Sequence, residues 1–258
     1  MMRNRFTLIT TTLCALTLCA SAAEAQDHVG EISFVLSKPS PDLVLSTDAL
    51  AGSSISEVDF VQEFGIEDKW FPAFRASLGR SHKFRLSYVK FRYEADATIQ
   101  RTFTFQGRTF TVGAPASTDI EWDLWTVGYE WDFVSRDAGF VGVIADLKYN
   151  RVKASVESPL LSSPAATDTK APIPAIGLAW RANPSPAFSI GGEFAGFKLD
   201  RDDFNVKFTD FDIYGMLNFR RNVGAQVGYR SVVADYVVEE DSGDLKMRGP
   251  YIAAMLRF

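Results

Sequence analysis

Few side chains of this chain could carry catalytic or metal chemistry. The sequence has two histidines, His28 and His82, and its two cysteines, Cys14 and Cys19, lie near the N-terminus. Imidazole is the base that works near neutral pH, and thiolates and imidazoles are the usual zinc ligands. The formal net charge of −5 over 258 residues does not suit a nucleic-acid partner. We therefore expect no cofactor, no metal site and no nucleic acid.

Acidic residues cluster at three places, but without the spacing of a known site. Asp119, Glu121 and Asp123 alternate along one segment, and acidic runs occupy 200–203 and 239–244. Neither run has the ligand spacing of an EF-hand loop. We interpret the first cluster as a solvated rim, with a pair of catalytic carboxylates as the weaker alternative. We interpret the two runs as solvated loop tips, with divalent-cation binding as the weaker alternative.

The elements that must position these side chains have the pattern of β-strands. In the last ten residues Ile252, Ala254, Leu256 and Phe258 alternate with positions that include Arg257, so one face is apolar and the other mixed. A terminal aromatic residue suits the aromatic girdle of an outer-membrane barrel. This ending resembles the C-terminal insertion signal of bacterial outer-membrane proteins. The resemblance implies that the barrel-assembly machinery is a partner during biogenesis.

The rest of the chain alternates in the same way. We expect about ten strands, with eight possible, because single-chain bacterial barrels have an even number. Short turns are expected on the periplasmic side. Longer extracellular connections are expected near 49–69, 100–117, 157–171 and 239–245, with a short helix within 57–66. The expected strands are 31–48, 70–78, 84–99, 119–133, 140–155, 173–181, 187–199, 206–220, 223–238 and 245–258.

The inward rows of these strands carry charges of both signs. A closed barrel of this size is only slightly wider than one that its interior side chains fill. Buried charges are costly unless they are paired and hydrogen-bonded, so we expect them to pair across the lumen. The expected structural network consists of Arg75, Arg85, Glu130, Asp132, Asp146, Lys148, Glu193, Asp210, Asp212, Arg220 and Arg230.

One strand breaks the pattern. Phe84, Leu86 and Tyr88 alternate as a lipid-facing row, but Lys90 and Arg92 continue the same row. A β-bulge near residues 88–89 would exchange the two faces. Alternatively, Lys90 already lies near the headgroups, where a charge costs far less than the roughly 2–4 kcal/mol of the bilayer midplane. The bulge is the preferred interpretation.

Residues 1–25 have the three parts of a secretory signal peptide: basic Arg3 and Arg5, an apolar run, and the A-x-A cleavage site formed by Ala23 and Ala25. The run is too short to span a bilayer as a helix, so cleavage is preferred over an uncleaved anchor, leaving a mature domain of residues 26–258. No apolar run after residue 25 is long enough for a transmembrane helix. If the mature chain spans a membrane, it must therefore do so as a closed sheet. A soluble β-sandwich also has strands in which apolar and polar residues alternate. The signal peptide, the terminal Phe258 and the uneven loop lengths favour another all-β fold, a closed antiparallel transmembrane up-and-down β-barrel.

Several segments resemble a family of uncharacterised outer-membrane β-barrel proteins of Gram-negative bacteria. The resemblance implies a barrel in the outer membrane and brings no established activity, so no functional residue is carried over. It rests on Leu45-Ser46-Thr47-Asp48, Val58-Asp59-Phe60, Phe64-Gly65-Ile66-Glu67-Asp68, His82-Lys83-Phe84-Arg85-Leu86-Ser87-Tyr88, Gly249-Pro250-Tyr251 and Arg257-Phe258.

Three functions fit these observations. A structural or surface-interaction barrel with a charge-filled lumen is preferred, followed by a small-solute or hydrophobic-ligand channel, and then by an enzyme. Omptin-like proteases, lipid A deacylases and outer-membrane phospholipases need a histidine at the extracellular side or in the lipid-facing wall. His82 lies in an expected periplasmic turn and His28 near the mature N-terminus, so we do not expect an enzyme. Outer-membrane lipids and lipopolysaccharide are the expected partners.

Overall fold

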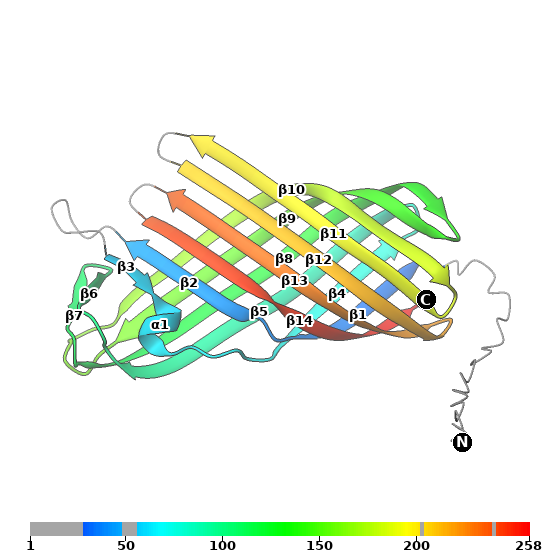
Figure 1. Cartoon of the computed structure of the whole chain (residues 1–258). Coiled ribbons are helices and arrows are strands. Elements are labelled where there is room, and N and C mark those ends of the chain that lie inside the picture. The colour runs from blue at the N-terminus through cyan, green and yellow to red at the C-terminus, as the bar shows by residue number, and fades with distance from the viewer. Residues whose placement is uncertain (1–27, 48–55, 202–203, 239–240) are drawn as a thin grey trace, which may run out of the picture.

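A computed structural model describes residues 28–47, 56–201, 204–238 and 241–258. These residues form one closed antiparallel β-barrel with ten strand positions, as expected (Figure 1). β1 (Gly30–Ser37) and β2 (Ser40–Thr47) share one position, because the last strand pairs with both. The other positions, in ring order, are β4 (Phe71–Gly79), β5 (His82–Thr98), β8 (Pro115–Arg136), β9 (Gly139–Glu157), β10 (Ala165–Ser185), β11 (Phe188–Arg201), β12 (Phe204–Arg220), β13 (Val223–Val238) and β14 (Asp241–Arg257).

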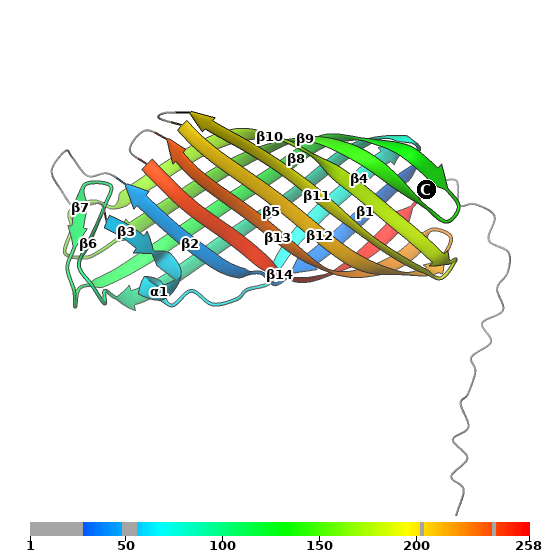
Figure 2. The ribbon, with the colours of Figure 1, turned by 45° about the horizontal axis from the view of Figure 1, so that its top comes forward.

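The two ends of the barrel differ. The short turns at 80–81, 137–138, 186–187 and 221–222 share one end with the C-terminus, and we call this half the terminal half (Figure 2). The other half, the loop half, carries β3 (Ser56–Asp59), helix α1 (Phe60–Phe64) and the hairpin of β6 (Phe103–Phe105) and β7 (Arg108–Phe110). No helix of the described residues is long and apolar enough to cross a membrane.

Several sequence-based boundaries are wrong. The expected connection 157–171 is shorter than expected, because β10 begins at Ala165 and pairs with β9 from there. The expected loop 239–245 is mostly strand, because β14 begins at Asp241 and pairs with both β13 and β2. The expected first strand 31–48 is broken between Ser37 and Ser40, where Pro39 has no N–H for the ladder. The short helix expected within 57–66 is confirmed as α1, with Asp59 capping its first turn and Gly65 in the left-handed conformation after its last.

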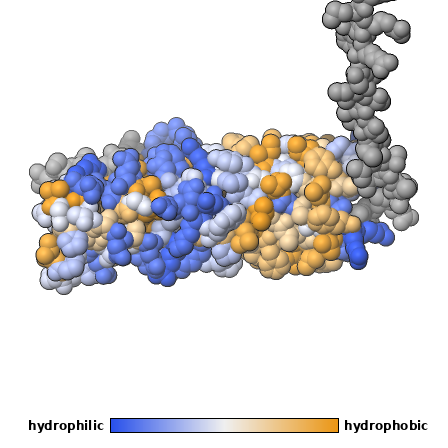
Figure 3. Space-filling view, turned by 60° about the horizontal axis from the view of Figure 1, so that its bottom comes forward, coloured by the Kyte–Doolittle hydropathy of each residue, from blue (hydrophilic) through white to orange (hydrophobic). Residues whose placement is uncertain are grey.

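The chemistry of the two wall faces reverses between the two halves. In the terminal half β8 exposes Trp125, Val127, Tyr129, Trp131 and Phe133, while the alternate residues are buried. In the loop half the buried row of β8 becomes apolar and the outer row becomes acidic. Figure 3 shows the result on one side: apolar residues gather over the terminal half and hydrophilic residues over the loop half. An apolar outer band of this kind matches a hydrocarbon layer.

The expected β-bulge in β5 is wrong. The β5–β8 register runs without a shift from His82 opposite Trp131 to Thr98 opposite Pro115. Val89, Phe91 and Tyr93 are buried, and Lys90 and Arg92 stay on the outside. The outer row turns from apolar to charged because the strand leaves the apolar band at this height.

Packed apolar side chains fill the loop half. α1 and the β6–β7 hairpin lie against its inner wall, where Phe60 meets Phe105 edge-on with ring centroids 5.5 Å apart. Phe71 meets Phe91 in the same way at 5.3 Å. Buried Glu63 of α1 accepts a hydrogen bond from Arg101 Nε at 2.9 Å, which ties the helix to the β5–β6 connection. This core fills the end of the barrel opposite the C-terminus.

Candidate functional site: the lumen of the terminal half

The lumen of the terminal half holds a polar cavity of about 700 Å³ that opens beside the short turns. Space exists because the inner rows of four adjacent strands, β8 to β11, carry small residues that project little into the barrel. Nine arginines and lysines and eight carboxylates line the cavity, so both charge signs are nearly balanced. The small inward residues are Gly128, Gly142, Ala175, Ala179 and Ala195.

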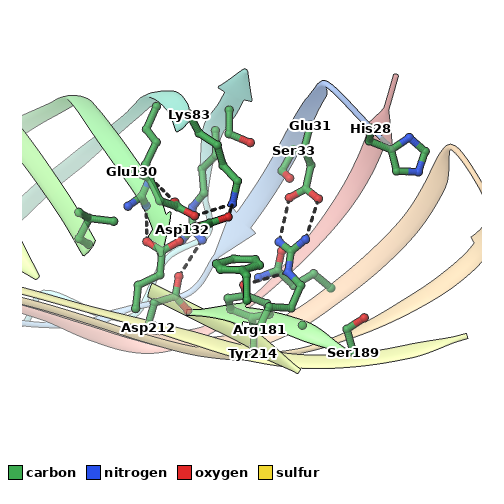
Figure 4. A pocket seen from close by; sticks show the side chains of 18 of the residues that line it. His28, Glu31, Ser33, Lys83, Glu130, Asp132, Arg181, Ser189, Asp212 and Tyr214 are labelled. Carbon is green, nitrogen blue, oxygen red and sulfur yellow. Dashed lines mark hydrogen bonds and ion pairs between the residues drawn. The ribbon is translucent and has the colours of Figure 1, made fainter. Parts of the chain in front are cut away.

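Several ion pairs cross the lumen. β1 and β10 occupy opposite positions of the ring, and Arg181 of β10 reaches Glu31 of β1 with both terminal nitrogens at 3.3 Å (Figure 4). Arg75 Nη1 lies 2.7 Å from Asp212 Oδ2. This pair also crosses the lumen, because β4 and β12 are several strands apart in the ring. Arg85 pairs with Glu193 from the far wall. Lys148 Nζ reaches Asp210 Oδ2 at 2.8 Å.

Pairs between neighbouring strands complete the network. Lys83 Nζ lies 2.6 Å from Glu130 Oε1 and 2.7 Å from Asp132 Oδ2, and these residues group together in Figure 4. Arg230 binds Asp210 through two nitrogens, at 3.0 and 2.8 Å. The carboxylates therefore remain buried without an isolated charge, which is the arrangement that makes buried ions tolerable.

The structure brings together all the expected lumen charges except Arg220. A register shift between Asn218 and Arg220 leaves Arg220 exposed at the end of β12, away from the network. Four charged members were not in the expected set: Glu31, Lys83, Arg181 and Arg257. Lys83 shares the inward row of the expected Arg85, and Arg257 alternates with the outward-facing Leu256 and Phe258, so alternation alone could have found both. Glu31 and Arg181 lie near strand ends, where the phase of a row is hardest to read.

The terminal strand has the orientation expected from its alternation. Ile252, Ala254, Leu256 and Phe258 are all exposed on the outer face. The Phe258 carbonyl accepts hydrogen bonds from the N–H groups of residues 29 and 30 at 2.8 and 2.9 Å, so the last residue helps to close the barrel. That the terminal strand acts as an insertion signal stays a prediction. The expected signal-peptide cleavage residues Ala23 and Ala25 lie outside the described residues.

Neither histidine is near the loop half. His82 begins β5, where its ring stacks on Trp131 and its Nδ1 contacts the Tyr129 hydroxyl. His28 lies at the mouth of the polar cavity. Among the described residues, no group of three or more metal-ligating side chains could hold an ion.

The acidic row of β8 forms ion pairs on the outer wall of the loop half. Glu121 Oε2 lies 3.1 Å from Lys90 Nζ and 3.7 Å from Lys153 Nζ. Asp119 pairs with Arg92 at 2.8 Å, and Asp123 accepts the Tyr88 hydroxyl at 2.9 Å. This arrangement is a solvated charge ladder, as expected for the rim.

The comparisons with known proteins concern the fold. No family model matches the sequence, and no curated protein matches it. The outer-membrane protease OmpT from Escherichia coli superposes with a TM-score of 0.54 at 10% identity, over 90% of this chain and 97% of that one. The Pseudomonas putida toluene transporter TodX gives 0.38 at 7% identity over 90% of both chains. Ail, the attachment invasion locus protein of Yersinia pestis, gives 0.35 at 14% identity, over 89% of this chain and 99% of that one. Only the first score supports a shared architecture, and at this identity it shows the fold alone: the chain has the fold of an outer-membrane β-barrel.

Proposed function

We propose that this protein is an integral outer-membrane barrel with a structural or surface-interaction role. The terminal half spans the bilayer, and the loop half stands outside the cell as a rigid extension. The apolar outer band supports this placement, because aromatic residues border it on both sides, as in known barrels. Tyr88, Trp125 and Tyr149 lie in register at one border, and Phe133 and Phe258 lie at the other.

The observation that carries the proposal is that the lumen is blind, which means that it opens at one end of the barrel only. The polar cavity opens beside the short turns, which are periplasmic in this orientation. Above Lys148 and Asn150 the inward rows become apolar, and fully buried Trp122 and Phe208 belong to the core that fills the loop half. Packed apolar side chains leave no room or hydrogen-bond partners for a column of water. Among the residues that the structure describes, this core leaves a solute no polar path through the barrel.

Conductance tests this proposal directly. Mature protein refolded into a planar bilayer should give only rare or small openings, while a porin in the same bilayer gives stable currents. Stable, large single-channel currents from the pure protein would contradict the blind lumen. They would favour the second candidate, a small-solute channel, for which the 700 Å³ polar cavity is the supporting observation.

Binding specificity then belongs to the loop half. Its outer wall carries a mixed row of charges immediately above the aromatic border, including Lys90, Arg92, Arg151 and Lys153 with their acidic partners. Such a ladder lies at the height of lipopolysaccharide phosphates, and we propose outer-membrane lipids and lipopolysaccharide as its neighbours. We assign no catalytic role, because both histidines lie at the periplasmic end.

A further inference from the structure

Two cations face each other on the outer wall of the loop half. The strand register sets Arg151 of β9 directly opposite Lys170 of β10, and the alternation of both strands points these side chains outward. Side chains at directly opposed positions have Cβ atoms about 4.5–5.5 Å apart, and like charges at such positions are destabilising. An anion that lies between the two side chains offsets this repulsion.

The protein leaves both cations accessible. Arg151 binds Asp168 through Nε and Nη2, which leaves Nη1 without a partner among the described residues, and its side chain is 34% exposed. Lys170 is exposed and forms no ion pair with any described residue. Exposed ion pairs such as the one between Arg151 and Asp168 contribute little, so the guanidinium is able to turn toward a ligand. Arginine and lysine are also the side chains that bind phosphate groups.

The cation pair lies one row beyond the aromatic border. The next outward row toward the terminal half places Tyr149 opposite Pro172, and Tyr149 also lies opposite Trp125 of β8. Trp125 and Tyr149 are both exposed on the outer face. Aromatic girdles mark the interface between the hydrocarbon layer and the headgroups. The cations are about 6.6 Å farther along the strand, so they meet lipid headgroups and not acyl chains.

A hollow of about 320 Å³ adjoins the cation pair on the side away from the aromatic border. The outer wall is indented there because two outward residues, Ser155 and Ala166, are small and face each other. Lys153 and Asp168 face each other in the row between the hollow and the cations, and both line the hollow. An ammonium donor, a carboxylate acceptor and a serine hydroxyl suit the hydroxyl groups of a sugar, each of which donates and accepts hydrogen bonds.

We propose that this part of the outer wall is a specific site for one phosphorylated glycolipid of the outer leaflet, of the lipid A class. A phosphate group lies between Arg151 and Lys170, the attached sugar lies in the hollow, and the acyl chains run along the apolar band below Tyr149. The assignment to the outer leaflet rests on the proposed function, which puts the loop half outside the cell. It gives lipopolysaccharide a defined place on the barrel instead of a general attraction to the charge ladder.

Other cations of the outer wall lack this combination. Lys198 of β11 faces Lys207 of β12, but each has its own carboxylate at 3.7 Å, Asp200 and Asp235 respectively. Neither lysine lines the hollow. Arg248 of β14 is exposed, but serines face it on both neighbouring strands, so it is a single cation. The second lysine pair therefore provides a matched control.

Native mass spectrometry of refolded mature protein in detergent tests the proposal, because it counts bound lipids and gives their affinity. Diphosphoryl lipid A should occupy one saturable site. Lipid A without its phosphates lacks the anion, and phosphatidylglycerol has a phosphate but no sugar, so each should bind at least ten-fold more weakly. Binding of either lipid as tight as that of diphosphoryl lipid A would overturn the proposal, and so would the absence of a saturable site for diphosphoryl lipid A.

Variants locate the site. Lys170→Gln removes a cation without an ion pair in the protein, so it should leave folding intact and weaken lipid A binding at least ten-fold. Ala166→Phe fills the hollow and should weaken lipid A binding at least ten-fold without changing phosphatidylglycerol binding. Lys207→Gln removes the same charge elsewhere on the outer wall and should leave lipid A binding unchanged.

Heat-modifiable migration verifies that each variant folds. Unchanged lipid A affinity in folded Lys170→Gln protein would refute the site, and so would an equal loss in Lys207→Gln protein, which would indicate general attraction. Conductance does not depend on this part of the wall. A failure of lipid A binding therefore leaves the blind lumen standing, whereas large currents would contradict the blind lumen without changing the binding result.

Discussion

A charge placed on the outer row of β8 should be costly in the terminal half and harmless in the loop half. Val127 is 55% exposed, and its register neighbours Leu86 and Leu147 are also exposed on the outer face. The substitution Val127→Arg therefore places a guanidinium among lipid-facing apolar side chains. Ser117→Arg changes the same row of the same strand in the loop half and is the matched control.

The expected magnitude follows from the depth of Val127. The apolar outer row runs from Trp125 to Phe133, about 26 Å along the strand at about 3.3 Å per residue, or about 20 Å of depth for a strand tilted by about 40°. Val127 lies about a quarter of the way into this band. An arginine costs about 2–4 kcal/mol at the midplane and about 0–1 kcal/mol at the border, so we expect Val127→Arg to cost about 2 kcal/mol. Ser117→Arg should stay within about 0.5 kcal/mol of the unchanged protein.

Urea unfolding and refolding in lipid vesicles measures both values. Tryptophan fluorescence reports the transition, because Trp125 and Trp131 lie in the apolar band. The midpoint for Val127→Arg should fall while the slope stays constant, and the midpoint for Ser117→Arg should not move. Equal costs for the two substitutions would refute the position of the membrane border, and with it the proposed division of the barrel into a spanning half and an external half.

Three further predictions address the terminal strand, the loop half and the wall. Phe258→Asp should abolish outer-membrane insertion, because the strand loses its aromatic anchor at the point where it closes on residues 29 and 30; normal levels of heat-modifiable protein from this variant would contradict it. Burial, and then the facing carboxylate of Asp244, raise the pKa of Asp235. The folded state therefore binds the proton more tightly, and the stability that this proton contributes is lost as the pH rises through the raised pKa. Asp235→Asn should raise the midpoint of thermal unfolding more at pH 7 than at pH 4. An equal rise at both pH values would count against repulsion between Asp235 and Asp244. Finally, β4 pairs with β5 only as far as Val89, and none of the backbone hydrogen bonds among the described residues joins 67–70 to β5. Hydrogen exchange should be faster in peptides covering 67–70 than in peptides covering 82–89, and equal protection would show that this part of the wall is continuous.

The alternation along each strand was enough to determine the barrel and most of its lumen. A side chain of a strand points to one face or the other with period two, which is a local property of the backbone. Val127 and Thr126 could therefore be assigned to opposite faces, and Arg75, Asp210 and Lys148 to the interior, without knowing any contact between strands. The terminal Phe258 and the even number of strands then indicated closure in a membrane.

Only the tertiary structure decided where along each strand the chemistry of the two faces reverses. Of the two explanations for the run from Phe84 to Arg92, the preferred bulge is wrong: the strand keeps its phase and leaves the apolar outer band instead. The partners of the lumen charges were equally hidden. Glu31 and Arg181 are 150 residues apart in sequence and meet because β1 and β10 lie opposite each other in the closed ring. Height in the membrane and distance across a lumen depend on the tilt and closure of the whole sheet, and no single strand contains that information.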